Sequence, residues 1–150
     1  MILHLSRTLA GAIRAQARDA GQAECCGLLL GDKAMLRVDD LLPAANVAAD
    51  PRHCFEIDPV VLLAAHKAAR AGGPAIVGHY HSHPRGEPVP SAADAAMAHD
   101  DGAVWLLVGR DGDLRVWQAT VQGALHGRFS ALEIAIEPES GLARADAQRH

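Results

Sequence analysis

The stretch GHYHSHPRGEPVPSAAD, residues 78–94, places histidines at every second position and ends in a serine and an aspartate. Side chains of a β-strand alternate between its two faces, so His79, His81 and His83 project to the same side. Same-face neighbours along a strand lie about 7 Å apart, which lets two imidazoles converge on one metal ion. Imidazole is also the commonest metal ligand among side chains. The stretch therefore predicts a strand over residues 74–84 with a metal site at its end.

A proline-broken loop separates this strand from Ser91 and Asp94. Ser91 is predicted to cap a helix over residues 91–100, with Asp94 in its first turn and pointing back toward the strand end. Two histidines and an aspartate, with one position left for water, form the donor set of a catalytic zinc site, whereas structural zinc usually has four protein ligands. Taken alone, Ser-x-x-Asp could be a capping box and each histidine an ordinary surface or core residue.

Composition places the chain among ordinary globular proteins. It has 150 residues, 49% of them hydrophobic, which suffices for one buried core and argues against two. A net charge of −4 without a basic cluster argues against nucleic acid as a partner. No apolar run approaches the roughly 20 residues that cross a bilayer, and the N-terminus lacks the order of a signal peptide. We therefore expect no membrane association and a cytoplasmic location.

The three cysteines fit no disulfide framework, and the adjacent Cys25 and Cys26 are predicted to be reduced and to face opposite sides of one strand.

Helices and strands are interleaved along the chain. Helices are predicted over residues 7–20, capped by Ser6, and over residues 59–72, capped by Asp58. Strands are predicted over residues 24–31, 34–46 (as one strand or two), 53–58, 74–84, 103–109, 114–120 and 132–137. The pair Gly31-Asp32 is predicted to form a hairpin turn. The pattern predicts a mixed α/β domain of about six strands and three helices, followed by a polar tail.

The stretch HSHPRGEPVPSAAD, residues 81–94, resembles the JAMM motif, also called MPN+, of the Mov34/MPN/PAD-1 zinc metalloproteases. That motif is His-x-His-Pro, a short loop and Ser-x-x-Asp. The family also has a glutamate far upstream at the start of a small-residue strand, which AECCGLLLG, residues 23–31, matches with Glu24. The resemblance extends from about residue 5 to residue 120, and the compact bacterial members are the most similar type. It implies an MPN/JAB1-like fold, in which helices flank a central mixed sheet in a cytidine-deaminase-like three-layer arrangement, over residues 1–137, with residues 138–150 as the tail.

The resemblance also implies a role for each site residue. His81, His83 and Asp94 would coordinate Zn²⁺, with water in the fourth position. Glu24 would activate that water as general base and then protonate the leaving amine. Ser91 would donate a hydrogen bond to the oxyanion.

The implied function is that of a zinc-dependent metallopeptidase or isopeptidase. Its substrate would be a ubiquitin-like protein or a sulfur carrier of the ThiS/MoaD type, cut after the C-terminal Gly-Gly. Two alternatives stay open: a metal-free MPN scaffold that binds partner proteins, and a cell-wall peptide amidase or peptidase. The sequence identifies neither the carrier protein, the leaving group nor the oligomeric state.

Other side chains near the site have weaker predictions. His79 stands where many members of the family have an aromatic residue, and it is predicted to pack on the metal face or to support the ligands. Arg85 and Glu87 lie in the loop beside the site and are candidates for substrate contact. Four more side chains are predicted to be buried: His53, Cys54, Trp105 and Trp117.

Overall fold

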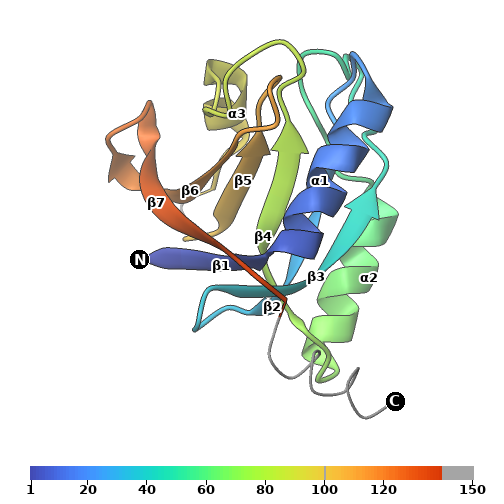
Figure 1. Ribbon diagram of the computed structural model, residues 1–150, viewed down its shortest axis with the longest axis vertical. Coiled ribbons are helices and arrows are strands. Elements are labelled where there is room, and N and C mark those ends of the chain that lie inside the picture. Colours follow the sequence, from blue (N-terminus) through green and yellow to red (C-terminus); the bar gives the residue numbers. More distant parts are fainter. Residues whose placement is uncertain (100, 140–150) are drawn as a thin grey trace.

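The computed structural model describes residues 1–99 and 101–139, and Figure 1 shows their arrangement. These residues form seven strands and three helices. In chain order they are β1 (Ile2–Ser6), α1 (Arg7–Ala20), β2 (Cys26–Asp32), β3 (Arg37–Ala44), α2 (Pro59–Arg70), β4 (Ala75–Ser82), α3 (Ala92–Met97), β5 (Val104–Val108), β6 (Leu114–Gly123) and β7 (Gly127–Glu137). Residues 140–150 of the predicted tail, and Asp100 at the end of the third predicted helix, lie outside the described residues.

The strands form one closed sheet in the order β1-β3-β2-β4-β5-β6-β7. The sheet is mixed, as predicted: β4 pairs antiparallel with β2 and parallel with β5. β1 closes it by pairing in parallel with both β3 and β7. Neither β1 nor the closure was predicted, because β1 has only five residues and runs directly into the capped helix.

β4 forms the predicted strand and pairs with a neighbour on each side, β2 and β5. The backbones of β4 and β5 approach closely at Gly78, where a Cβ atom would lie 2.0 Å from the carbonyl oxygen of Val104. Only glycine fits at this point of the strand. The pairing continues to the end of β4, where His81 stands opposite Cys26 of β2 and Leu107 of β5.

The helix predictions hold best where capping residues mark the ends. Ser6 Oγ accepts a hydrogen bond from the backbone N–H of Leu9 at 3.1 Å, and α1 ends at Gly21, whose φ is +63°. Asp58 caps α2 in the same way, with Pro59 as the first helical residue. α3 is shorter than predicted because the backbone turns extended at residue 98. Figure 1 shows α1 across one face of the sheet and α3 near the ends of β4 and β5. No helix in the described ranges is long and apolar enough to cross a membrane.

Two hydrophobic clusters lie on opposite faces of the sheet. One packs α1 against the strands and contains Cys25 and Tyr80. The other contains Cys26, Phe55 and Trp105. The adjacent cysteines therefore face opposite sides, as predicted, and both are unpaired thiols. The second cluster forms the floor beneath the histidines of β4, because the rings of Phe55 and Trp105 pack against them.

One strand prediction and one turn prediction are wrong. Residues 53–58 form a loop whose sheet contact is one isolated bridge between Asn46 and Ile57. Instead, the backbone of this loop forms hydrogen bonds with the side chain of Asn46. Asn46 Oδ1 accepts from the Glu56 N–H at 3.0 Å, and Asn46 Nδ2 donates to the Cys54 carbonyl at 3.1 Å. The hairpin turn lies at residues 33–36 and not at Gly31-Asp32, because β2 and β3 stay paired through Asp32.

Candidate metal centre

Three side-chain atoms converge at the end of β4. The Nε2 atoms of His81 and His83 lie 3.2 Å apart, and Asp94 Oδ2 lies 3.2 Å from the first and 3.1 Å from the second. Ligands at about 2.0–2.1 Å from a tetrahedral zinc ion are about 3.3 Å from one another. The triangle of donor atoms therefore fits one such ion without rearrangement.

The two histidine rings are held by different means. His83 Nδ1 lies 2.9 Å from the backbone carbonyl of Glu87, to which it donates, and this leaves the lone pair of Nε2 facing Asp94. The ring of His81 stacks on Phe55, with centroids 4.1 Å apart and planes 19° apart. His81 Nδ1 is buried and has no hydrogen-bond partner among the described residues. Stacking on Phe55 and the contact of Nε2 with Asp94 Oδ2 at 3.2 Å thus orient this ring.

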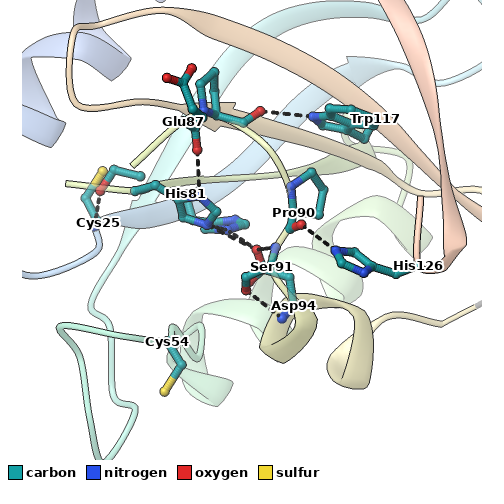
Figure 2. A network of polar contacts seen from close by, with 12 residues as sticks. Cys25, Cys54, His81, Glu87, Pro90, Ser91, Asp94, Trp117 and His126 are labelled. Atoms are coloured by element: carbon teal, nitrogen blue, oxygen red, sulfur yellow. Dashed lines mark hydrogen bonds and ion pairs between the residues drawn. The ribbon is translucent and has the colours of Figure 1, made fainter. Parts of the chain in front are cut away.

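Asp94 is aimed by the start of α3. Its Oδ2 accepts a hydrogen bond from the backbone N–H of Ser91 at 2.9 Å, and its own N–H donates to Ser91 Oγ at 3.1 Å. This capping box fixes the carboxylate toward the histidines, as Figure 2 shows. Since Ser91 Oγ acts as the acceptor in this pair, its own hydrogen stays available for a substrate.

The loop between the histidines and α3 is tied down by its proline carbonyls. Trp117 Nε1 donates to the carbonyl of Pro88 at 3.1 Å, and His126 Nε2 lies 3.0 Å from the carbonyl of Pro90 (Figure 2). Because a proline has no backbone N–H to donate, these two residues can join the surrounding structure only through their carbonyl oxygens. They keep Ser91 in register with the end of β4.

Glu24 approaches the same point from the start of β2. One of its carboxylate oxygens and the donor atoms of His81, His83 and Asp94 all lie within 4.8 Å of one another. The side chain is only 6% exposed, and Oε1 has no hydrogen-bond partner in the described part of the chain. Burial raises the pKa of the Glu24 carboxyl to about 7. Such a group can gain and lose a proton near neutral pH.

The electrostatics of the triangle suit a cation. Burial alone would raise the pKa of Asp94, but the contacts with His81 and His83 outweigh it and hold the pKa well below its usual range. Burial lowers the pKa of His81 and so favours the neutral imidazole that binds metals. Burial alone would lower the pKa of His83, but its contacts with Asp94 and the Glu87 carbonyl outweigh burial and raise that pKa. A metal ion that binds here would therefore displace a proton from His83, while Asp94 and His81 already have the protonation states that it requires.

With this geometry in view, comparisons with known proteins identify the family. The profile described as "Prokaryotic homologs of the JAB domain" matches residues 6–120. The chain belongs to this family. Its predicted membership of the JAMM/MPN+ group is thereby confirmed, and so is its place among the homologues of JAMM-type metalloproteases.

Two relatives of this JAB-domain protein have names that describe a cleaving activity. A protein of Haloferax volcanii named desampylase is 38% identical over 115 residues, which are 77% of this chain and 79% of that protein. A protein of Thermus thermophilus named probable TtuB-protein conjugate cleaving protease is 32% identical over 112 residues, 75% of this chain and 73% of that protein.

Solved structures confirm the predicted MPN/JAB1 fold. The solution structure of a Desulfitobacterium hafniense protein matches with a TM-score of 0.79 and 27% identity, over 95% of this chain and 97% of that one. The crystal structure of a JAB1/MPN domain protein from Archaeoglobus fulgidus matches with a TM-score of 0.57 and 21% identity, over 89% of this chain and 97% of that one.

Two residues that shape the JAB-domain site were missed by the sequence analysis. Asn46 Nδ2 donates to the backbone carbonyl of Glu24 at 2.9 Å and so ties the glutamate to the loop before α2. Phe55 stacks on His81 from that same loop. A loop asparagine and a lone phenylalanine give no signal in the sequence, because the partner of each lies far along the chain.

Ser82 connects the strand of Glu24 to the strand of the histidines. Its Oγ accepts a hydrogen bond from the backbone N–H of Cys25 at 2.8 Å, next to Glu24 in the chain. The backbone N–H of Glu24 donates to the carbonyl of Pro51 at 2.8 Å. The glutamate is therefore fixed on both sides relative to the three converging donors.

The weaker predictions have mixed outcomes. Trp105 is buried and Trp117 partly so, as predicted. His53 is exposed because its ring pairs at the surface with Asp50, at 2.9 Å, and Cys54 is only half-buried. The burial predicted for these two residues is therefore wrong.

His79 lies on the metal face but outside the cluster of four side chains. Its ring packs against Trp105, with centroids 4.3 Å apart, and against Phe55. Burial lowers the pKa of His79 to about 3, and its Nε2 has no hydrogen-bond partner among the described residues. The ring thus fills the place of an aromatic side chain beneath the site.

Proposed function

We propose that this JAB-domain protein is a zinc-dependent peptidase or isopeptidase. It hydrolyses the bond after the C-terminal Gly-Gly of a ubiquitin-like or sulfur-carrier protein. The observation that carries this proposal is the convergence of His81, His83 and Asp94 on one point, with the Glu24 carboxylate within 4.8 Å. The names of the Haloferax and Thermus relatives support the substrate class.

Zinc suits this donor set better than other common ions do. Imidazole nitrogens with one carboxylate oxygen are ligands of catalytic zinc, whereas magnesium and calcium prefer oxygen ligands alone. The edges of the donor triangle, 3.1–3.2 Å, fit the tetrahedral geometry of zinc. When bound, the ion would supply Lewis-acid chemistry, lowering the pKa of water and polarising the scissile carbonyl.

Glu24 is the proton carrier in this proposal. Its Oε1 is unpartnered and buried, so it can accept a proton from the attacking water molecule. A carboxyl with a pKa of about 7 then holds that proton and returns it to the nitrogen of the leaving amine. One side chain thereby acts as base and then as acid.

Ser91 stabilises the charge that develops on the carbonyl oxygen. Its Oγ already accepts from the N–H of Asp94, so the hydroxyl hydrogen points elsewhere and can donate to the substrate. The cap fixes the position of Oγ before substrate arrives, and a donor placed in advance costs no reorganisation during the reaction.

We further propose that the protein acts in the cytoplasm. The three unpaired cysteines, two of them buried, suit a reducing compartment. Cytoplasmic carrier proteins with exposed Gly-Gly tails would then be within reach of the enzyme.

The test combines metal content with cleavage. The zinc-loaded protein is incubated with a ThiS-type sulfur carrier whose C-terminal Gly-Gly is extended by a short peptide, and the products are weighed by mass spectrometry. We expect one zinc ion per chain and a product that ends in Gly-Gly. Removal of zinc by a chelator should abolish cleavage, and added zinc should restore it.

Two histidine variants supply the comparison. His81→Ala should lose stoichiometric zinc and all cleavage, while His66→Ala, at an exposed position of α2, should keep both. A protein that binds no zinc, or in which His81→Ala changes nothing, would favour the scaffold alternative.

A further inference from the structure

A cleft of about 310 Å³ opens beside the cluster of donor residues. Its lining joins Glu24, His83 and Ser91 to two arginines, Arg52 and Arg85. Positive charge at this place is not needed to hold a metal ion and would weaken its binding. The arginines therefore call for an explanation in terms of the substrate.

Arg85 is fixed in place but not neutralised. One guanidinium nitrogen donates to the backbone carbonyl of Arg52 at 3.1 Å. In the described ranges neither arginine forms an ion pair, and no other hydrogen bond engages the guanidinium of Arg85. A planar guanidinium that is held at one corner keeps a fork of donors suited to a carboxylate.

The acidic groups nearby do not cancel this charge. The Asp50 carboxylate is engaged by the ring of His53 at 2.9 Å. Glu87 lines the same cleft, but its carboxylate points away from the cluster while its carbonyl faces His83 (Figure 2). Two arginines and two glutamates, Glu24 and Glu87, thus line the cleft, and no carboxylate in the described ranges forms an ion pair with the guanidinium of Arg85.

Arg85 and Glu24 line the same cleft. In the proposed function Glu24 returns a proton to the leaving nitrogen, so the leaving group must sit beside Glu24. The atoms attached to that nitrogen therefore enter the part of the cleft that Arg85 faces.

We infer that Arg85 is a specificity determinant that selects a leaving group with a carboxylate next to the scissile nitrogen. This chemistry describes a single amino acid linked through its α-amino group, whose carboxylate carbon is two bonds from that nitrogen. A lysine side chain linked through its ε-amino group has only methylene groups at that distance. The inference rests on the proposed function and narrows its substrate class.

The experiment compares an acid with its amide. The zinc-loaded full chain acts on a ThiS-type carrier extended after Gly-Gly by one alanine, either with a free carboxylate or as alaninamide. Because a carboxylate contact acts on the bound substrate as well as on the transition state, we expect the difference in KM, with kcat nearly unchanged. The wild type should favour the acid in kcat/KM by about tenfold, the size of one charge-assisted hydrogen bond.

Two arginine variants decide the outcome. Arg85→Gln should bring the acid-to-amide ratio close to one and keep its zinc, whereas Arg110→Gln, exposed on the β5–β6 turn, should keep the wild-type ratio. A ratio near one in the wild type, or an unchanged ratio in Arg85→Gln, would overturn the inference and leave the proposed function intact. Zinc-bound protein that cuts neither substrate would instead overturn the proposed function, and the inference with it.

Discussion

Asp94 and Ser91 hold each other by two hydrogen bonds that serve both the fold and the site. The Ser91 N–H donates to Asp94 Oδ2 at 2.9 Å, and the Asp94 N–H donates to Ser91 Oγ at 3.1 Å. The same Oδ2 atom lies 3.2 Å from His81 Nε2 and 3.1 Å from His83 Nε2. The two interpretations of Ser-x-x-Asp, a helix cap and a part of a metal site, are therefore compatible in this chain.

Ser91→Ala should cost both stability and rate. Loss of an N-cap acceptor typically lowers the free energy of unfolding by about 1 kcal/mol. Loss of one donor to the oxyanion typically lowers kcat by about 10²–10³-fold. Urea unfolding and steady-state kinetics on the carrier substrate measure the two effects separately.

Ser6→Ala is the matched control for that variant. Ser6 Oγ caps α1 by accepting from the N–H of Leu9 at 3.1 Å, which is the same type of contact away from the metal centre. We expect a similar loss of stability with unchanged kcat. Equal kcat in Ser91→Ala and Ser6→Ala would remove Ser91 from the mechanism.

Glu24→Gln should separate catalysis from metal binding. Without a proton acceptor the rate should fall by about 10²–10⁴-fold, the usual contribution of a general base. Zinc should be retained, since the proposed ligands are untouched. The free energy of unfolding should not decrease, because Oε1 is buried without a partner and the amide removes a poorly solvated charge.

Metal analysis, urea unfolding and kinetics on the same preparation check these three expectations. Glu133→Gln, at an exposed position of β7, is the control and should behave as the wild type. Wild-type turnover in Glu24→Gln would reject the proposed base. Loss of zinc would instead indicate that Glu24 is itself a ligand.

Local patterns account for most of what the sequence predicted. Alternation brought His81 and His83 to one face, and the capping residues Ser6 and Ser91 marked the starts of α1 and α3. Each of these signals depends on residues within a few positions of one another, where strand and helix geometry are fixed. The donor residues therefore converge as their spacing suggested.

Contacts between distant segments could not be predicted in the same way. Asn46 meets the Glu24 carbonyl across 22 residues, and Phe55 stacks on His81 from a loop that resembled a strand. The apolar side chain of Phe55 is buried against a histidine ring and not within the sheet. β1 closes the sheet only because β7 lies beside it, and five residues give no signal of that pairing.

His79→Phe should show that His79 acts by packing. Its ring contacts Trp105 and Phe55, while its Nε2 is buried without a partner in the described part of the chain. A phenyl ring of similar size removes the unpaired nitrogen, so the free energy of unfolding should stay equal or rise by up to about 1 kcal/mol. Zinc content and kcat should stay within about twofold of the wild type, because His79 Nε2 forms no hydrogen bond to the proposed ligands. A clear loss of zinc affinity would show that Nε2 supports the metal ligands.

Gly78→Ala should damage the site through the backbone. A Cβ atom at this position would lie 2.0 Å from the Val104 carbonyl oxygen and 2.8 Å from its nitrogen, and backbone atoms of a paired strand cannot give way as a flexible side chain can. Separating β4 from β5 should lower the free energy of unfolding by about 3 kcal/mol, at the upper end for overpacked cores. Zinc affinity should fall as well, because His81 stands three residues further along the same strand, paired with Leu107 of β5.

Gly11→Ala is the control: no atom lies within 4 Å of its added Cβ atom, and in the middle of α1 alanine should stabilise the protein by about 0.5–1 kcal/mol. Opposite signs for these two glycine substitutions in urea unfolding, with zinc affinity lowered only in Gly78→Ala, would show that the close approach of β4 and β5 holds the metal centre together. Equal effects would mean that the sheet can open at Gly78 without disturbing His81.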